Sequence, residues 1–133
     1  MVLFVCVHNS GRSQMAETFF NHEARRRALS VRAASAGTLG AGSLNPVVEE
    51  AMIEIGVPLE GHFPKVLTPE MVQKAERIVS MGSGVDAEAC PTRFLVTEDW
   101  GLDDPAGHNL DVVRLIRDEV RVRVERLLDE LGV

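Results

Sequence analysis

The chain has 133 residues, of which 45% are apolar and 26% charged, and its formal net charge is −6. These values predict one globular domain over residues 1–133 with a packed core. The acidic balance argues against a nucleic acid or an anionic membrane as a partner. The apolar run from Val2 to Val7 is too short to span a bilayer and lacks the flanks of an export signal. Two cysteines are too few for a disulfide framework, so we expect a soluble, cytoplasmic protein.

The first half of the chain predicts a strand, a loop and a helix, and then a second strand and helix. Val2–Cys6 is an unbroken β-branched and aromatic run, typical of a strand buried on both faces of a parallel sheet. A polar loop follows, and then apolar residues recur at helical spacing, at Met15, Ala16, Phe19, Phe20 and Ala24. Ser30–Ala36 is predicted as the second strand. Asn45-Pro46 is a helix start signal, so we expect a helix from Pro46 to about Ile55, ended by Gly56.

The second half continues the alternation of helices and strands. Thr68-Pro69 predicts a short helix, and Arg77–Met81 and Phe94–Thr97 are predicted as the third and fourth strands. A final amphipathic helix is indicated by apolar residues three or four apart, at Leu110, Val113, Ile116, Val120, Val124, Leu127 and Leu131. Strands that alternate with helices predict an α/β sandwich with right-handed crossovers.

A loop between the first strand and the first helix carries the clearest chemical signal. It runs from Cys6 to Ser13, with the pattern Cys, five residues, Arg12 and Ser13. In this position successive backbone N–H groups can surround one point, which predicts an oxyanion site made by Val7, His8, Asn9, Ser10, Gly11, Arg12 and Ser13. Gly11 and Asn9 tolerate unusual backbone angles. The Arg12 guanidinium matches two oxygens of a phosphate-like ion, so we expect a tetrahedral oxyanion as ligand.

Cys6 is the predicted nucleophile. The same positive environment favours its thiolate, and the Ser13 hydroxyl is placed to donate to the sulfur. The alternative is that Cys6 is a small buried residue at a strand end. A displaced oxygen also needs a proton donor, and among the adjacent carboxylates Asp103 and Asp104 we assign this role to Asp104. The alternative for Asp104 is a solvated acidic turn.

These motifs resemble a known family. Phe4–Glu17 and Glu98–Gly107, together with Ser35–Thr38 and Gly61-His62, resemble arsenate reductases built on the low-molecular-weight protein tyrosine phosphatase fold. The resemblance covers essentially the whole chain and implies a three-layer α/β sandwich with a four-stranded parallel sheet. It also implies Cys6 as nucleophile, Arg12 and the loop amides as oxyanion binders, and Asp104 as acid. Phosphatases of this fold usually carry an aromatic residue after Asp-Pro, where this chain has Ala106, so the resemblance is to the reductase branch.

Arsenate reduction needs electrons, which the resemblance implies come from further thiols. Thioredoxin-linked members use two more cysteines; Cys90 matches one of them, but Ser83 stands at the other. Either Cys90 forms a disulfide with Cys6, or mycothiol, bacillithiol or glutathione attacks the adduct and a glutaredoxin-like protein completes the cycle. Cys90 as an inert small residue is the remaining alternative.

No cofactor or metal is expected. His22, His62 and His108 are widely separated and show no ligand spacing with one another or with either cysteine. Some members of the family bind potassium through equivalents of Asn9 and Glu17 and an aspartate in the segment after Gly61-His62. In this chain that segment is Phe63-Pro-Lys65, which suggests that the positive side chain of Lys65 occupies the region instead. We expect a monomer. Two other functions stay open: a phosphomonoesterase working through a phospho-cysteine, and an anion-binding module in which Cys6 never turns over.

Overall fold

The computed structural model describes residues 1–39, 42–82 and 96–132. In chain order the elements are β1 (Val2–Cys6), α1 (Arg12–Arg26), β2 (Ala33–Gly37), α2 (Pro46–Ile53), α3 (Pro69–Lys74), β3 (Arg77–Ser80), β4 (Glu98–Asp99) and α4 (Leu110–Leu131). No helix in these ranges is both long and apolar enough to cross a membrane.

The sheet has four parallel strands in the order β2-β1-β3-β4. All five residues of β1 are buried, as expected for the central strand of a parallel sheet. Cys6 pairs with Gly37 and Val5 pairs with Ser80, so the carboxyl ends of β2, β1 and β3 meet at one edge of the sheet. In open parallel sheets this edge is where ligand sites are built.

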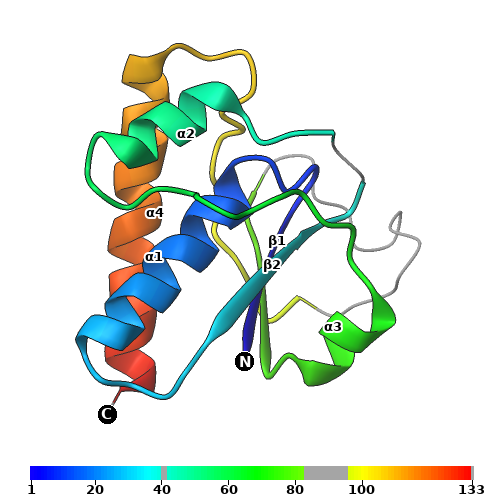
Figure 1. Cartoon of the computed structure of the whole chain (residues 1–133). Coiled ribbons are helices and arrows are strands. Elements are labelled where there is room, and N and C mark those ends of the chain that lie inside the picture. Colours follow the sequence, from blue (N-terminus) through cyan, green and yellow to red (C-terminus); the bar gives the residue numbers. More distant parts are fainter. Residues whose placement is uncertain (40–41, 83–95, 133) are drawn as a thin grey trace.

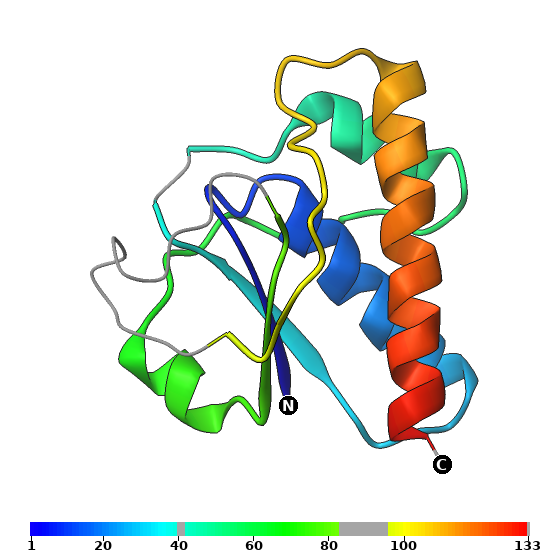
Figure 2. The ribbon, with the colours of Figure 1, turned by 180° about the vertical axis from the view of Figure 1, so that it is seen from behind.

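The sheet lies between two layers of helices. One face, which includes Phe4 and Val79, packs against α1, α2 and α4, while the other, which includes Leu3 and Val5, packs against Leu67 and α3. Figure 1 shows α3 on the opposite side of the strands from α1 and α4, and Figure 2 shows the same layers from behind. The predicted three-layer α/β sandwich with a four-stranded parallel sheet is confirmed.

The fourth strand is the clearest error of the sequence prediction. The strand was predicted at Phe94–Thr97, but β4 is Glu98–Asp99, and Val96 and Thr97 precede it. Residues 94 and 95 lie outside the described residues. Thr97 N donates to Ile78 O and Trp100 N to Ser80 O, so the chain pairs with β3 just after the apolar run. A two-residue edge strand follows the neighbouring backbone, and its polar residues give no hydrophobic signal.

The other boundaries differ by a few residues. The second strand starts at Ala33 instead of Ser30, and the third ends at Ser80 instead of Met81. The helix predicted for Pro46–Ile55 ends at Ile53, because the chain turns before Gly56, whose φ is 75°. Its start is as expected: the Asn45 side chain accepts hydrogen bonds from the first turn of α2.

An ion-paired contact fixes α2 against α4. Glu54, the C-cap of α2, accepts hydrogen bonds from Arg114 at 2.9 Å and from Arg117, and Arg117 also donates to Ala51 O. The hydrogen bond from Arg114, followed by that from Arg117, lowers the pKa of Glu54 from 4.5 to about 2. At its other end α2 is tied to the Cys6–Ser13 loop, because Asn45 N donates to Ser10 O.

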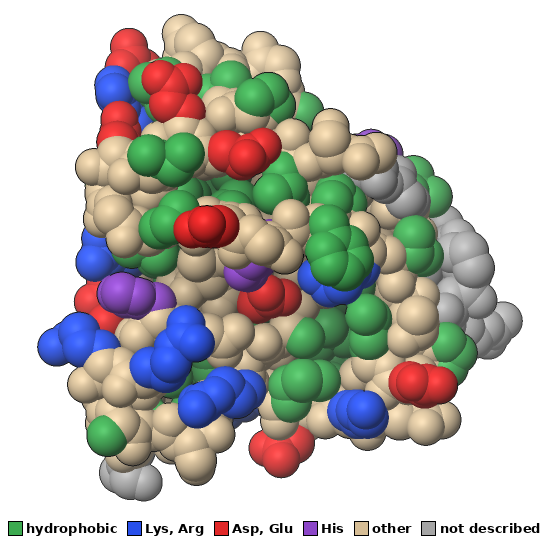
Figure 3. Space-filling model, in the orientation of Figure 1, with side chains coloured by type: hydrophobic (Ala, Val, Ile, Leu, Met, Phe, Trp, Pro, Cys, Tyr) green, Lys and Arg blue, Asp and Glu red, His purple; other side chains and the backbone are tan. Residues whose placement is uncertain are grey.

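Charge is unevenly spread over the surface. Figure 3 shows acidic side chains over α2 and basic ones over the C-terminal end of α1. The basic groups there include Arg26 and Arg27, which both pair with Glu23; the hydrogen bond from Arg26 is the largest cause that lowers the pKa of Glu23 to about 2. Much of this positive charge is therefore compensated locally.

Candidate active site

The loop from Cys6 to Ser13 joins the end of β1 to the start of α1 at Arg12. Asn9 takes the left-handed conformation, with φ of 55°, which asparagine adopts more readily than most residues. Asn9 and Gly11 are buried, while His8 is exposed and Val7 and Ser10 are half-buried. The two residues that follow β2 hold the loop in place, because Thr38 N donates to Cys6 O and Leu39 N donates to Val7 O.

The sulfur of Cys6 lies at the base of this loop, with only 3% of the residue exposed. Asn9 N donates to Cys6 Sγ at 3.3 Å, and Ser13 Oγ lies 2.9 Å from the sulfur. Asn9 Nδ2 donates to Ser13 Oγ at 2.7 Å, and a Cys6 thiolate can only accept, so the hydrogen of the Ser13 hydroxyl is directed to the sulfur when Cys6 is ionised. Two donors therefore face Cys6 Sγ, and both favour a negative charge on it.

Arg12 and Asp104 lie side by side although they are distant in sequence. Arg12 is buried, and its Nη1 donates to Met81 O at 3.2 Å and to Leu102 O at 3.1 Å. Its Nη2 lies 3.8 Å from Asp104 Oδ2, while Asp104 Oδ1 accepts from Ala106 N at 3.0 Å. The two carbonyls fix the guanidinium, and the turn after Leu102 brings a carboxyl group to it. The Arg12 guanidinium, which can bind an oxyanion, and the Asp104 carboxyl group, which can carry a proton, are thus neighbours.

Gly11 is required for a different reason from the one expected. Its φ is −147°, outside the left-handed region, so unusual φ does not explain the glycine. A Cβ at this position would instead lie 2.8 Å from Pro105 Cγ and 3.4 Å from Val48 Cγ2. Gly11 therefore lets the Asp104-Pro105 turn pack directly on the loop.

Gly82 brings the same turn close at its other end. Its φ is 107°, and a Cβ there would lie 2.2 Å from Leu102 O, an impossible contact. Trp100 packs on Phe4 with ring centroids 5.3 Å apart and donates to Glu98, so it belongs to the core under the site. The segment 100–105 is thus placed by close backbone packing.

A polar cluster lies behind the loop. Glu17 accepts a hydrogen bond from Ser35 at 2.8 Å and lies 3.3 Å from His62 Nδ1 and 3.9 Å from Lys65 Nζ. Lys65 N donates to Asn9 Oδ1 at 2.9 Å. The ammonium group of Lys65 thus lies beside Glu17, as the sequence suggested. Within residues 1–39, 42–82 and 96–132, no group of three His, Cys, Asp or Glu side chains is arranged to hold a metal ion. The absence of a metal requirement stays a prediction.

Gln14 also belongs to this cluster, although the sequence analysis did not predict it as a site residue. It is fully buried and donates through Nε2 to Asn9 and to Phe63 O. A glutamine in the first turn of a helix is ordinarily exposed, so its type and position gave little signal. Two other predicted positions, Cys90 and Ser83, lie outside the described residues.

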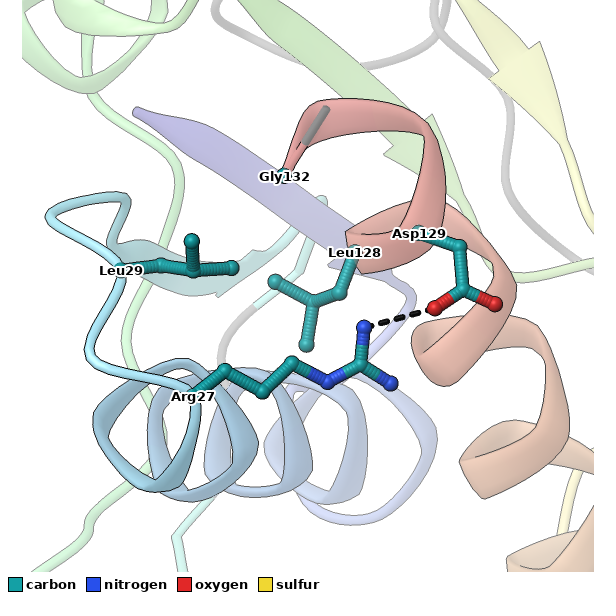
Figure 4. Close-up of a pocket in the computed structure, with 5 residues that line it drawn as sticks. All are labelled: Arg27, Leu29, Leu128, Asp129 and Gly132. Atoms are coloured by element: carbon teal, nitrogen blue, oxygen red, sulfur yellow. Dashed lines mark hydrogen bonds and ion pairs between the residues drawn. The ribbon is translucent and has the colours of Figure 1, made fainter.

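Some surface hollows lie away from this loop. Figure 4 shows one of about 320 Å³ between the C-terminal ends of α1 and α4, bordered by Arg27, Leu29, Leu128, Asp129 and Gly132. The ion pair of Arg27 and Asp129, at 2.6 Å, crosses this hollow. It lies at the end of the sheet opposite Cys6 and holds no nucleophile, so it is a gap between helix ends.

Comparison with known proteins agrees with this geometry. The family described as low molecular weight phosphotyrosine protein phosphatase matches residues 1–133. The chain belongs to this family. This confirms the family predicted from the sequence, and the Cys6–Ser13 loop lies between strand and helix in this family member as the motif predicted.

Relatives in this family carry the name arsenate reductase. A protein of Halobacterium salinarum named "Putative arsenate reductase" is 38% identical, over 97% of this chain and 91% of its own length. Arsenate reductase 2 of Staphylococcus saprophyticus is 31% identical, over 96% and 95%. The similarity extends over nearly the full length of each protein.

Solved structures of two activities share the fold. An arsenate reductase in a phosphate-binding state is 32% identical, with a TM-score of 0.80 over 97% of this chain and 96% of that chain. The arginine phosphatase YwlE, with a phosphorylated active-site serine, is 25% identical, with a TM-score of 0.85 over 98% and 95%. The fold is therefore shared by reductases and phosphatases, and the residues around Cys6 must distinguish them.

Proposed function

We propose that this chain reduces arsenate to arsenite, with Cys6 as the nucleophile. The observation that carries the proposal is the sulfur at the base of the loop, which faces two hydrogen-bond donors, Asn9 N and the Ser13 hydroxyl. The relatives named arsenate reductase, at 31% and 38% identity over nearly the whole chain, support arsenate as the oxyanion.

The first step forms a covalent adduct. The Cys6 thiolate attacks the arsenic of arsenate, an S–As bond forms, and one As–O bond breaks. The departing oxygen takes a proton from Asp104 and leaves as water. The loop amides of residues 7–13 and the guanidinium of Arg12 hold the remaining oxygens, and the positive N-terminal end of α1 adds to this attraction.

The second step supplies the electrons. A second thiolate attacks the adduct: Cys90 attacks Cys6 Sγ, a disulfide forms, and the S–As electron pair stays on arsenic, which leaves as arsenite. Two thiols are oxidised and one arsenic is reduced by two electrons. Thioredoxin would then reduce the Cys6–Cys90 disulfide. In the other route the thiolate of mycothiol, bacillithiol or glutathione attacks the arsenic of the adduct, the bond from arsenic to Cys6 breaks, and a thiol–arsenate species leaves. A thiolate of a glutaredoxin-like protein then attacks the sulfur of that species, a mixed disulfide forms, and the S–As electron pair leaves with arsenite.

Phosphomonoester hydrolysis is the second candidate. The similarity to the arginine phosphatase YwlE, at a TM-score of 0.85, favours a phosphatase reaction, because attack of Cys6 on phosphorus uses the same loop. Asp104 would protonate the leaving group, and water would release phosphate. One observation argues against it. Ala106 follows Asp104-Pro105, and the chain has no tyrosine, so no aromatic side chain at this position can pack against the ring of an aryl phosphate.

The deciding experiment measures steady-state arsenate reduction by the purified protein in two coupled systems. One contains thioredoxin and thioredoxin reductase, and the other a low-molecular-weight thiol with glutaredoxin recycling. Turnover in the first, lost in Cys90→Ser, supports the internal disulfide; turnover only in the second supports the external thiol. No arsenate reduction in either system, together with rapid hydrolysis of para-nitrophenyl phosphate, would refute the reductase assignment. Cys6→Ser should abolish every activity.

We further propose that the enzyme is a cytoplasmic monomer. Both thiol routes need a reducing compartment, where cysteines stay free between turnovers. Elution at the size of a 14.6 kDa monomer would support the oligomeric state, and elution as a stable dimer would contradict it.

A further inference from the structure

A continuous chain of polar side chains runs from the surface residue His62 to the sulfur of Cys6. His62 Nδ1 lies 2.9 Å from Gln14 Oε1, and Gln14 Nε2 lies 2.8 Å from Asn9 Oδ1. Asn9 Nδ2 lies 2.7 Å from Ser13 Oγ, which lies 2.9 Å from Cys6 Sγ. His62 is about one quarter exposed, and the other four residues are buried.

Backbone groups fix the orientation of both amides in this chain. The atom of Asn9 that faces Lys65 N at 2.9 Å must be the oxygen, because a backbone N–H can only donate. The atom of Gln14 that faces Asn9 O at 3.1 Å and Phe63 O at 3.0 Å must be the nitrogen. Gln14 Oε1 therefore faces His62, and His62 Nδ1 must carry a hydrogen.

Every link consequently donates in the direction of the sulfur. His62 donates to Gln14, Gln14 to Asn9, Asn9 to Ser13, and Ser13 to Cys6. Hydrogen bonds aligned in one direction polarise each other, so each link strengthens the next. The last acceptor is the atom on which negative charge is needed.

We propose that Gln14 is a positioning residue for Cys6. Its donation to Asn9 holds that residue in its left-handed conformation, keeps Ser13 directed at the sulfur, and links the sulfur to the hydrogen on His62 Nδ1. The proposal rests on Cys6 being the nucleophile of the proposed function, but not on which oxyanion Cys6 attacks.

Charged groups around His62 act on the outer end of the chain. Glu17 Oε2 lies 3.3 Å from His62 Nδ1, and Lys65 Nζ lies 3.9 Å from Glu17 Oε1. On its other side His62 borders a hollow of about 340 Å³, which is also bordered by His22, Arg25 and Glu60. The neutral tautomer without a hydrogen on Nδ1 would direct a lone pair at two oxygens, so the surroundings favour the donating form.

The test measures alkylation of Cys6 by iodoacetamide as a function of pH. A Cys90→Ser background leaves Cys6 as the only thiol, since the chain has two cysteines. Gln14→Met keeps the length of the side chain but removes its donors and acceptor. We expect its alkylation inflection to move to higher pH and the rate near pH 6 to fall about tenfold or more.

Two further variants separate positioning from general damage. Thr18→Val removes the hydrogen bond from Thr18 Oγ1 to Gln14 O, in the same helix but outside the chain of donors, and should leave the pH profile unchanged. His62→Leu removes only the outermost donor and should shift the profile in the same direction as Gln14→Met. His62→Gln, which retains an N–H donor, should restore part of the rate.

The outcomes distinguish this proposal from the function itself. A parent protein whose Cys6 reacts no faster than a free thiol would refute Cys6 as an activated nucleophile. If Cys6 of the parent is reactive and folded Gln14→Met has the same pH profile of alkylation, only the positioning role is overturned. If Gln14→Met does not fold, an unchanged pH profile in His62→Leu overturns it instead. Equal shifts in Thr18→Val and Gln14→Met would also overturn it.

Discussion

Substitution of Gly11 by alanine tests whether the Asp104 turn works through direct packing on the loop. The added Cβ would lie 2.8 Å from Pro105 Cγ and 3.4 Å from Val48 Cγ2. Carbon atoms in contact prefer about 3.5–4.0 Å, so Pro105 must retreat by roughly 1 Å. Asp104 precedes Pro105 in the chain and would move with it.

The displacement should affect proton transfer more than the reactivity of the thiolate. Misplacement of a reacting group by about 1 Å can lower a rate by roughly a hundredfold, so we expect kcat for arsenate to fall by about ten- to hundredfold. Overpacking should lower the free energy of unfolding by about 1–3 kcal/mol. Alkylation of Cys6 should stay within about threefold of the parent rate, because its two donors, Asn9 N and the Ser13 hydroxyl, lie away from the clash.

Two controls make the reasoning refutable. Gly42→Ala adds a Cβ that meets no atom within 4 Å among the described residues other than its chain neighbours, and it should leave kcat and stability unchanged. Pro105→Ala in the Gly11→Ala background removes the clashing Cγ and should recover part of kcat, which a double-mutant cycle measures. Parent-like kcat in Gly11→Ala, or no coupling between the two sites, would refute the packing argument.

Three further predictions concern the sulfur, the arginine and an ion pair. Ser13→Ala removes a charge-assisted hydrogen bond, about 1.5–3 kcal/mol, so alkylation of Cys6 near neutral pH should slow roughly ten- to hundredfold; an unchanged rate would contradict this. Arg12→Lys keeps the charge but loses the planar fork, so kcat/KM for arsenate should fall roughly thirtyfold, about 2 kcal/mol, and parent-like kinetics would be evidence against the role. Because two arginines of α4 lower the pKa of Glu54 to about 2, its stabilisation is present above about pH 4.5 and is lost as the pH falls toward 2. Glu54→Gln should therefore lower Tm at pH 7 but not near pH 2. Glu50→Gln, at a residue for which the described part of the chain shows no arginine partner, should lower Tm at neither pH. An equal effect of Glu54→Gln at both pH values would contradict the linkage.

Agreement between sequence and structure follows the strength of the local pattern. Val2–Cys6 was predicted to the residue because a buried parallel strand is continuously apolar. The helix starts after Asn45 and Thr68 were also correct, since capping is decided by adjacent residues. The fourth strand was misplaced because Glu98–Asp99 owes its pairing to the neighbouring backbone and not to its own side chains.

The sequence by itself determined the order of the elements, the loop between Cys6 and Ser13, and the family. Each of these depends on residues close together in the chain, where spacing, caps and motifs are directly visible. The tertiary structure alone decided what the loop contacts. The packing of Pro105 on Gly11, the carbonyls that hold Arg12, and the donors from His62 to Cys6 join segments far apart in sequence. Such contacts depend on how the sheet and helices assemble, and a single sequence carries no local pattern for them.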